Sequence, residues 1–332
     1  MNIKVLWVFI SVIMLTVFLA ACGGEKDKPS TSSAEDSKKE AKKLHVYTTI
    51  YPFEYFANRI GGQYVEAECI MPPGADDHSY EPSTKQIVQI SNSDLFIYNG
   101  LGLESYAGKI TSALEKQNVK VVEASKGLRT IEHEDHDHEH HDDGHDDDHH
   151  EEEHHHDHGD EDPHVWIDPE RSITLAENIK NALVELKPQE KELFEKNFAE
   201  LKADLQSLNK DFSKLIGVKK NPKIIVSHAA YGYWEDRYGL KQIPIAGLSP
   251  SEEPSQKDLA RIVSTAKKDK IKYVIFEQNV TPKVAEIIRK EIKAEPLHLH
   301  NLAVLTDQDI KNHQDYISLM KENLKTLKQA LD

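Results

Sequence analysis

Two stretches of this chain, far apart in the sequence, have the same local design. The first runs from His45 to Gly61 and the second from Lys223 to Gly239. Each begins with an apolar run of strand character, continues through a small polar corner into an aromatic helix start, and ends with Arg-x-Gly. Glycine at that place is typical of a helix C-cap. A strand-to-helix unit that recurs about 180 residues later predicts two lobes of similar construction.

Strands and helices alternate on both sides of this repeat. Short apolar runs bounded by turn residues predict strands, and apolar residues at helical spacing predict helices. Because two parallel strands need a crossover connection, this alternation indicates an α/β fold with two similar parallel-sheet lobes. The predicted strands include Asp94–Tyr98, Val119–Glu123 and Tyr273–Phe276, and the predicted helices include Glu104–Gln117, Ser255–Lys268 and Thr281–Ile292.

The stretch between the two lobes is helical in character. From Glu170 to Ile216 it is rich in Ala, Leu, Glu and Lys, with apolar residues near helical spacing. Pro188 favours the start of a second helix there, because proline is tolerated in a first turn. That helix would be roughly 42 Å long and could bridge both lobes. We expect a first lobe over 44–187, a linking helix over 188–216 and a second lobe over 217–332.

The N-terminus has the pattern of a secretory signal. Lys4 precedes an apolar run over residues 5–21 that ends in small residues. A transmembrane anchor is the competing interpretation, but about 17 apolar residues are at the lower limit for crossing a bilayer. The sequence Leu-Ala-Ala-Cys at 19–22 resembles a bacterial lipobox. That resemblance implies a signal peptide over 1–21 and a lipid on Cys22.

The residues after Cys22 indicate a flexible tether. The stretch over 22–43 has no large apolar side chain until the body of the protein begins at Leu44. If Cys22 is lipidated, Cys69 has no disulfide partner. Cys69 lies in the apolar-leaning run Val65–Met71 and is most simply a small buried hydrophobic residue, the alternative being a nucleophile or metal ligand.

The segment from Glu132 to Asp162 carries 12 histidines and 17 acidic residues and no lysine or arginine. It has no large apolar side chain with which to form a core, so we expect a solvated, disordered loop. Neutral imidazole is a common ligand for zinc, copper and nickel, and carboxylates attract cations. A merely acidic linker would not need this density of histidine. The predicted weak metal-collecting residues are His133, His136, His138, His140, His141, His145, His149, His150, His154, His155, His156 and His158.

The strong negative charge of the chain comes from this segment alone. Of the 57 acidic residues, 17 lie within it, which leaves 40 acidic residues against 41 basic ones elsewhere. Outside the segment the sequence shows no basic stripe of the kind that nucleic-acid binding requires. Nucleic acid is therefore not an expected partner.

Three histidines outside the segment occupy similar local settings. His78 lies in a turn-rich stretch after a predicted strand, His164 directly follows the histidine-rich segment, and His228 ends a predicted strand. Because ligands bind α/β proteins at the carboxyl ends of the strands, these side chains can converge on one metal ion. His45, at the start of a predicted strand, is expected to be structural. His313 is expected to be a surface residue. His298 and His300 alternate along a predicted strand and could line the same edge.

No catalytic motif stands out in the sequence. It has no Gly-x-Ser-x-Gly elbow, no phosphate-binding loop and no His-Glu-x-x-His. Three histidines with an open fourth position would also suit a hydrolytic zinc ion, so the ligand count alone leaves an enzyme open.

Several motifs together resemble the zinc-specific solute-binding lipoproteins of bacterial ABC importers. The matching stretches are the lipobox, Pro72–Pro82, the acidic histidine-rich insertion, Pro163–Asp168, Ser227–Tyr231 and Gly247–Ser255. The resemblance implies two α/β lobes joined by a rigid helix, with the metal in the cleft between them. It also implies His78 and His164 as ligands from the first lobe and His228 from the second. Three imidazoles favour zinc over manganese, which prefers oxygen ligands.

The fourth ligand is open in this chain. Ala303 stands where some relatives of this family have a carboxylate, and alanine cannot coordinate a metal. We expect water first, then Asp77, which precedes His78. Glu277, at a predicted strand end, comes third and is more simply a residue that positions a ligand or caps a helix.

The resemblance implies a transport protein and no enzyme. The expected function is zinc capture and delivery to an ABC permease and its ATPase, with Zn²⁺ as the cargo. The protein would be a monomer held by its lipid on the outer face of the cell membrane, in a Gram-positive bacterium. The alternatives are a membrane-tethered zinc hydrolase with Asp77 or Glu277 as general base, and a surface adhesin or zinc buffer.

Overall fold

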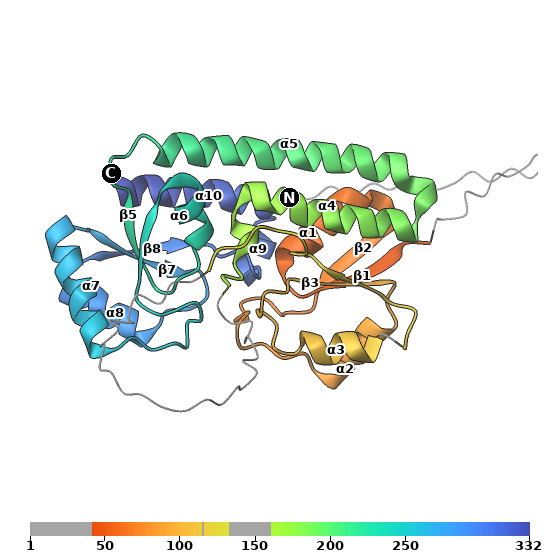
Figure 1. The fold of residues 1–332 in the computed structure, drawn as a ribbon, viewed down its shortest axis with the longest axis horizontal. Helices are drawn as coiled ribbons and strands as arrows, with labels where there is room; N and C mark the ends of the chain where they lie inside the picture. Colours follow the sequence, from red (N-terminus) through yellow and green to blue (C-terminus); the bar gives the residue numbers. More distant parts are fainter. Residues whose placement is uncertain (1–41, 115, 133–160) are drawn as a thin grey trace, which may run out of the picture. The chain divides into compact units, whose positions relative to one another are not determined.

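The computed structural model describes residues 42–114, 116–132 and 161–332 (Figure 1). The predicted signal peptide, Cys22, nearly all of the tether and the twelve histidines of the histidine-rich segment lie outside these residues. Residues 42–332 form one compact unit. Among the described helices, none has the length and apolar character needed to cross a membrane.

Two four-stranded sheets, both entirely parallel, form the framework of the protein. Both have the same strand order, since β2-β1-β3-β4 in the first is matched by β6-β5-β7-β8 in the second. This arrangement confirms the predicted α/β fold with two similar lobes. The strands are β1 Leu44–Thr48, β2 Val65–Cys69, β3 Leu95–Tyr98, β4 Lys120–Glu123, β5 Lys223–Val226, β6 Lys241–Pro244, β7 Tyr273–Glu277 and β8 Glu295–Leu299.

Helices connect the strands and cover the sheets (Figure 1). Several begin at a side chain that accepts a hydrogen bond from the first turn, such as Ser83, Ser255 and Asp315. The α-helices are α1 Tyr51–Gly61, α2 Thr84–Ser91, α3 Ala107–Leu114, α4 Pro169–Leu186, α5 Lys191–Ile216, α6 Gly232–Tyr238, α7 Gln256–Asp269, α8 Lys283–Glu291, α9 Asp307–Lys311 and α10 Tyr316–Leu331. Three short 3-10 helices are η1 Gly62–Tyr64, η2 Val165–Ile167 and η3 Pro188–Glu190.

The 26-residue helix α5 contacts helices of both lobes. It packs against α1 and α4 beside the first sheet and against α6 and α10 beside the second, and Figure 1 shows it running along both. Pro188 begins the short turn η3, so the long helix starts three residues later than the sequence predicts. The lobe boundaries at 187 and 217 remain a prediction, because the compact unit is continuous across them.

Two local predictions are wrong, and backbone geometry gives the reason. The observed helix α3 is shorter than the helix predicted over 104–117. Leu101 and Gly102 adopt left-handed backbone angles, and the Glu104 carboxylate accepts a hydrogen bond from the Asn99 amide at 2.7 Å, so the helix begins only at Ala107. In the first repeat the left-handed C-cap is Gly62, with φ of 53°, and Gly61 is the last residue of α1. In the second repeat Gly239 is the left-handed C-cap, as predicted.

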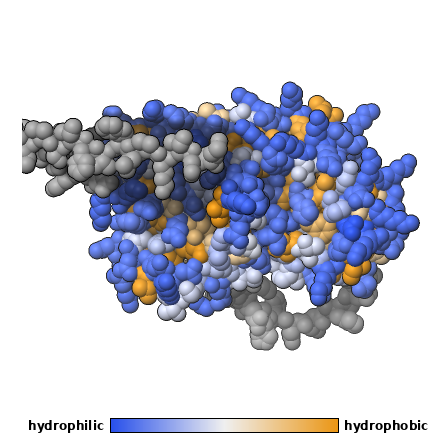
Figure 2. Space-filling model, turned by 180° about the vertical axis from the view of Figure 1, so that it is seen from behind, coloured by the Kyte–Doolittle hydropathy of each residue, from blue (hydrophilic) through white to orange (hydrophobic). Residues whose placement is uncertain are grey.

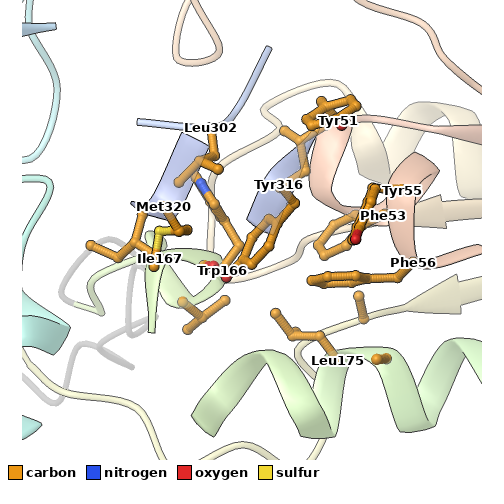
Figure 3. Close-up of a cluster of buried hydrophobic side chains, with 14 of the residues drawn as sticks. Tyr51, Phe53, Tyr55, Phe56, Trp166, Ile167, Leu175, Leu302, Tyr316 and Met320 are labelled. Carbon is orange, nitrogen blue, oxygen red and sulfur yellow. Dashed lines mark hydrogen bonds between the residues drawn. The ribbon is translucent and has the colours of Figure 1, made fainter. Parts of the chain in front are cut away.

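A single large hydrophobic cluster extends through both lobes. At its centre Trp166 and Tyr316 are completely buried, close to the aromatic residues of α1 (Figure 3). The Trp166 indole donates to the carbonyl of Asn301 at 2.7 Å, and the Tyr316 hydroxyl donates to the carbonyl of Trp166 at 2.7 Å. This shared core fixes the two sheets relative to each other. On the face drawn in Figure 2, hydrophobic residues lie in small separate patches among hydrophilic ones.

Two glycine-to-alanine substitutions should have opposite effects on stability. In Gly61→Ala the new Cβ would lie 2.1 Å from a methyl group of Val65, so we expect a loss of about 1–3 kcal/mol. In Gly108→Ala, within α3, the new Cβ meets no atom within 4 Å, so we expect a gain of about 0.5–1 kcal/mol. Urea unfolding of the metal-free protein measures both. Equal effects for the two variants would contradict the predicted crowding at Gly61.

Candidate metal centre

Three histidines from distant parts of the chain come together in the structure. His78 lies in the loop between β2 and α2, and His164 immediately precedes η2. His228 comes two residues after the end of β5. One ring nitrogen from each lies within 4.8 Å of the other two. His164 and His228 are almost completely buried, and the side chain of His78 is mostly buried. These are the three residues that the sequence singled out, and their role as ligands is taken up below as a proposal.

The parallel topology explains part of this convergence. Strands β5 and β7 are neighbours, with Val226 opposite Ile275. Their carboxyl ends therefore lie at one edge of the second sheet. His228 follows β5, and Glu277 is the last residue of β7, which places an imidazole beside a carboxylate. Glu277 is thus located as predicted, at a strand end.

Two of the imidazoles are oriented by buried carboxylates. Nδ1 of His164 lies 2.7 Å from Oδ1 of Asp162, and Nδ1 of His228 lies 3.0 Å from Oε1 of Glu277. The second contact has the distance of an ion pair but not the angle of a regular hydrogen bond, so we treat it as a charge interaction. With Nδ1 of each ring facing a carboxylate, Nε2 is left with a free lone pair.

Two of the three Nε2 atoms are in contact with each other, and the third has no partner. Nε2 of His78 lies 3.1 Å from Nε2 of His164, and Nε2 of His228 is buried without a hydrogen-bond partner. A buried polar atom without a partner is costly. Asp77 Oδ2 and Glu277 Oε1 also have no hydrogen-bond partner, so three of the six such side-chain atoms among the described residues belong to this site. This donor set fits a divalent cation that prefers imidazole.

Burial sets the charge states of the groups in the centre. Burial first, and then the nearby rings of His164 and His228, lower the pKa of His78 to about 2, so this ring stays neutral. For His228 burial lowers the pKa, but Glu277, together with the charges of Asp77 and Asp162, outweighs it and the pKa is raised overall. Burial first, and then the charge of Glu277, raise the pKa of Asp77 to about 6. Asp77 Oδ2 lies 4.0 Å from Nε2 of His78.

Helix α6 holds the segment that carries His164. The Tyr233 hydroxyl donates to the carbonyl of Asp162 at 2.6 Å, and the Trp234 indole donates to the carbonyl of Ile167 at 2.8 Å. Arg237 Nε contacts both carboxylate oxygens of Asp168 at 2.6 and 2.8 Å. These bonds join a helix of the second lobe to the chain around His164.

Arg171 completes this charge network, whose buried members are Arg171 and Asp168. Its guanidinium lies 2.6 Å from Asp168 and 2.7 Å from Asp236 of α6, and its carbon lies 4.4 Å from the ring centre of Tyr233. Sequence reasoning missed this network and also the role of Asp162, which it counted within the acidic segment. The spacing Asp-Pro-His at 162–164 is the signal that could have found Asp162.

The described ends of the histidine-rich segment lie beside the metal centre. Glu132 and Glu161 form an antiparallel bridge, and the amide of Asp162 donates to the carbonyl of Ile131 at 3.0 Å. Asp162 in turn contacts His164. Both ends of the segment are therefore close to one of the three histidines.

Other sequence candidates lie outside the centre. Strand β8 ends at Leu299, and His300 Nε2 lies 3.1 Å from Asp309 instead, so the idea that His300 lines the metal edge is wrong. His298 is exposed on β8. Ala303 is fully buried, and its carbonyl accepts a hydrogen bond from the Tyr51 amide at 2.8 Å.

The structure also shows the surroundings of a cysteine and two histidines that the sequence named. Cys69 is half-buried rather than buried, and burial raises the pKa of its thiol, which disfavours the reactive thiolate. His45 and His313 are exposed, on β1 and after α9 respectively.

Comparison with known proteins points to one family. The chain matches the family described as "Zinc-uptake complex component A periplasmic" (ZnuA) over residues 46–330. It is 36% identical to the "High-affinity zinc uptake system protein ZnuA" of Bacillus subtilis, over 95% of this chain and 94% of that protein. It is also 36% identical to the "Zinc-binding lipoprotein AdcA" of Streptococcus pneumoniae, over 96% of this chain. The chain spans only 60% of the length of that AdcA.

A solved structure shares the fold. It is the Zn(II)-bound ZnuA-like domain of Streptococcus pneumoniae AdcA, with a TM-score of 0.71 and 35% sequence identity. The similarity covers 87% of this chain and 99% of that domain.

The Asp168→Asn substitution should destabilise the protein strongly. Asp168 is completely buried and is bonded by both Arg171 and Arg237. Removing one partner of a buried ion pair leaves the opposite charges without full compensation. We therefore expect the free energy of unfolding to fall by about 3–5 kcal/mol. Glu322→Gln, which removes an exposed ion pair with Lys325, is the control and should change stability little. Chemical unfolding of both variants measures the difference, and equal stabilities would contradict it.

Proposed function

We propose that this chain, which belongs to the ZnuA family of zinc-uptake components, captures zinc outside the membrane and delivers it to a membrane permease. The observation that supports this most directly is the convergence of one ring nitrogen each from His78, His164 and His228 within 4.8 Å. The names of the relatives, a zinc uptake protein and a zinc-binding lipoprotein, agree with it.

The chemistry of the donor set favours zinc. Zinc sites take nitrogen ligands in tetrahedral geometry, whereas manganese prefers oxygen. Here the three converging donors are imidazoles, two of which have Nδ1 facing a buried carboxylate. Such carboxylates orient the ring and raise its basicity as a ligand. A bound zinc ion would satisfy the unpartnered Nε2 of His228.

The fourth position of the zinc ion would be taken by water or by Asp77. Asp77 is buried, its Oδ2 has no hydrogen-bond partner, and this oxygen lies on the Nε2 side of His78. Glu277 is less suitable, because it faces Nδ1 of His228 and its Oε2 accepts a hydrogen bond from Asn301 at 3.1 Å. Glu277 therefore positions a ligand instead of binding the ion.

The remaining parts of the proposal follow from a transport role. The histidine-rich segment collects zinc through weak contacts, and the buried centre holds one ion tightly. The protein is a monomer that a lipid on Cys22 holds at the outer face of a Gram-positive cell membrane. An ABC permease with its ATPase takes up the ion. Neither a zinc hydrolase nor an adhesin or zinc buffer is favoured by a specific contact among the described residues.

Removing either zinc-binding part should produce a distinct loss. His228→Ala removes one ligand and the triple variant His78→Ala/His164→Ala/His228→Ala removes all three, so tight binding should disappear while weak sites remain. Deleting residues 133–160 should do the reverse, because Glu132 and Glu161 already pair across the gap. Isothermal titration with zinc, with a chelator competition for the tight site, measures both. Loss of tight binding in the deletion variant alone would overturn the assignment to the buried centre.

Asp77→Asn in the same titration distinguishes a carboxylate ligand from water.

Zinc affinity should fall as the pH drops, and Glu277 should set where it begins to fall. Zinc needs neutral imidazole. Because the pKa of His228 is raised, a proton competes with zinc there already above the ordinary histidine value of about 6.5. His78, with its pKa lowered to about 2, does not compete in this range. Glu277→Gln removes the largest of the negative charges that raise the pKa of His228, so the fall in affinity should move to lower pH.

Titrations at a series of pH values check this shift. Glu253→Gln, on an exposed loop, is the matched control and should behave as the unmodified protein. An unchanged pH profile in Glu277→Gln would show that this carboxylate does not control the protonation of His228.

A further inference from the structure

One end of the second lobe, away from the metal centre, carries a cluster of lysines. Parallel strands begin at one edge of their sheet. Lys223 is the first residue of β5, and Lys272 directly precedes β7. At the opposite edge His228 follows β5 and Glu277 ends β7. A strand of five residues separates these edges by roughly 17 Å.

Only part of this positive charge is neutralised. Lys219 Nζ lies 2.5 Å from Asp332, and Lys223 Nζ lies 2.6 Å from Asp269. These residues line a pocket of about 340 Å³. Three further lysines in its lining are exposed and have no ion pair among the described residues. They are Lys220, Lys270 and Lys272. Because the chain outside the acidic segment is almost neutral, such a cluster does not follow from its composition.

An exposed hydrophobic residue accompanies the lysines. Val218 directly precedes Lys219 and is 76% exposed, the highest value among the large hydrophobic residues that the structure describes. Basic residues beside an exposed apolar side chain are typical of surfaces that rest on a membrane, where the apolar group enters the interface and the lysines meet lipid phosphates.

We propose that this basic end, formed by Val218, Lys219, Lys220, Lys223, Lys270 and Lys272, binds the surface of a membrane through the headgroups of anionic phospholipids. A free phosphate ion would offer no apolar partner to Val218, whereas a lipid interface does. The choice of lipid also rests on the proposed location at the membrane. Since the metal centre lies at the other edge of the sheet, this contact leaves the zinc ligands uncovered.

Vesicle binding tests the proposal without the predicted lipid anchor. Residues 42–332 form one compact unit that contains every described helix and strand, so this part can be used alone. We expect it to sediment with vesicles of phosphatidylcholine plus phosphatidylglycerol, and not with phosphatidylcholine alone. Each lysine near an anionic surface strengthens binding by roughly fivefold. Lys220→Glu/Lys270→Glu/Lys272→Glu should therefore weaken it by about 100-fold or more, and salt should weaken it in the unmodified protein.

Matched variants separate this surface from general charge. Lys283→Glu/Lys311→Glu/Lys321→Glu makes the same change of charge at exposed lysines elsewhere and should bind at least tenfold more tightly than the cluster variant. Val218→Ser should weaken binding measurably. Equal binding by the two triple variants, or displacement by inorganic phosphate at constant ionic strength, would overturn the proposal. Zinc affinity should be the same in all these variants, so a negative result here does not bear on zinc capture.

Discussion

The pairing of buried imidazoles with buried carboxylates is the interaction on which the metal centre depends. Asp162 faces Nδ1 of His164, and Glu277 faces Nδ1 of His228. Each carboxylate faces Nδ1 and leaves Nε2 of its ring to other contacts, and Nε2 of His164 lies 3.1 Å from Nε2 of the third histidine, His78. Without them, rings buried among aromatic residues such as Trp166 could rotate or bond elsewhere. The geometry of the three nitrogens is therefore fixed by the protein before any ion arrives.

The fold supplies the rigid support that these pairs need. The hydrophobic core is continuous through both lobes, and α5 packs on helices of each. Helix α6 adds buried bonds from Tyr233, Trp234 and Arg237 to the segment around His164. Two of the proposed ligands, His164 and His228, are thus held in segments that are joined by more than a hinge. This arrangement restricts how far the lobes can separate.

The sequence predicted the parts of this structure that depend on local pattern. The repeated strand-to-helix unit gave the two parallel sheets, and the three histidines were identified from their positions after strands and loops. The sequence could not give the Arg171–Asp168–Arg237 network, because Arg237 is remote in the chain from the other two residues. The role of Asp162 was missed because this residue lies inside an acidic run, where only the spacing Asp-Pro-His signals it. His300 was misjudged since strand β8 ends one residue before it, and Gly62 instead of Gly61 caps α1 since the final turn extends one residue further.

The proposed division of labour between the histidine-rich segment and the buried centre has its physical basis in solvation. A zinc ion held by solvated side chains exchanges its ligands with water readily, whereas an ion in the proposed centre would supply the partner that the buried Nε2 of His228 lacks. The described ends of the segment meet at Glu132 and Glu161, one residue from Asp162. Under the proposed function, a segment anchored at both ends beside Asp162 raises the concentration of zinc near His164. Weak collection and tight retention thus need no direct contact between the two parts, only the short distance that this bridge maintains.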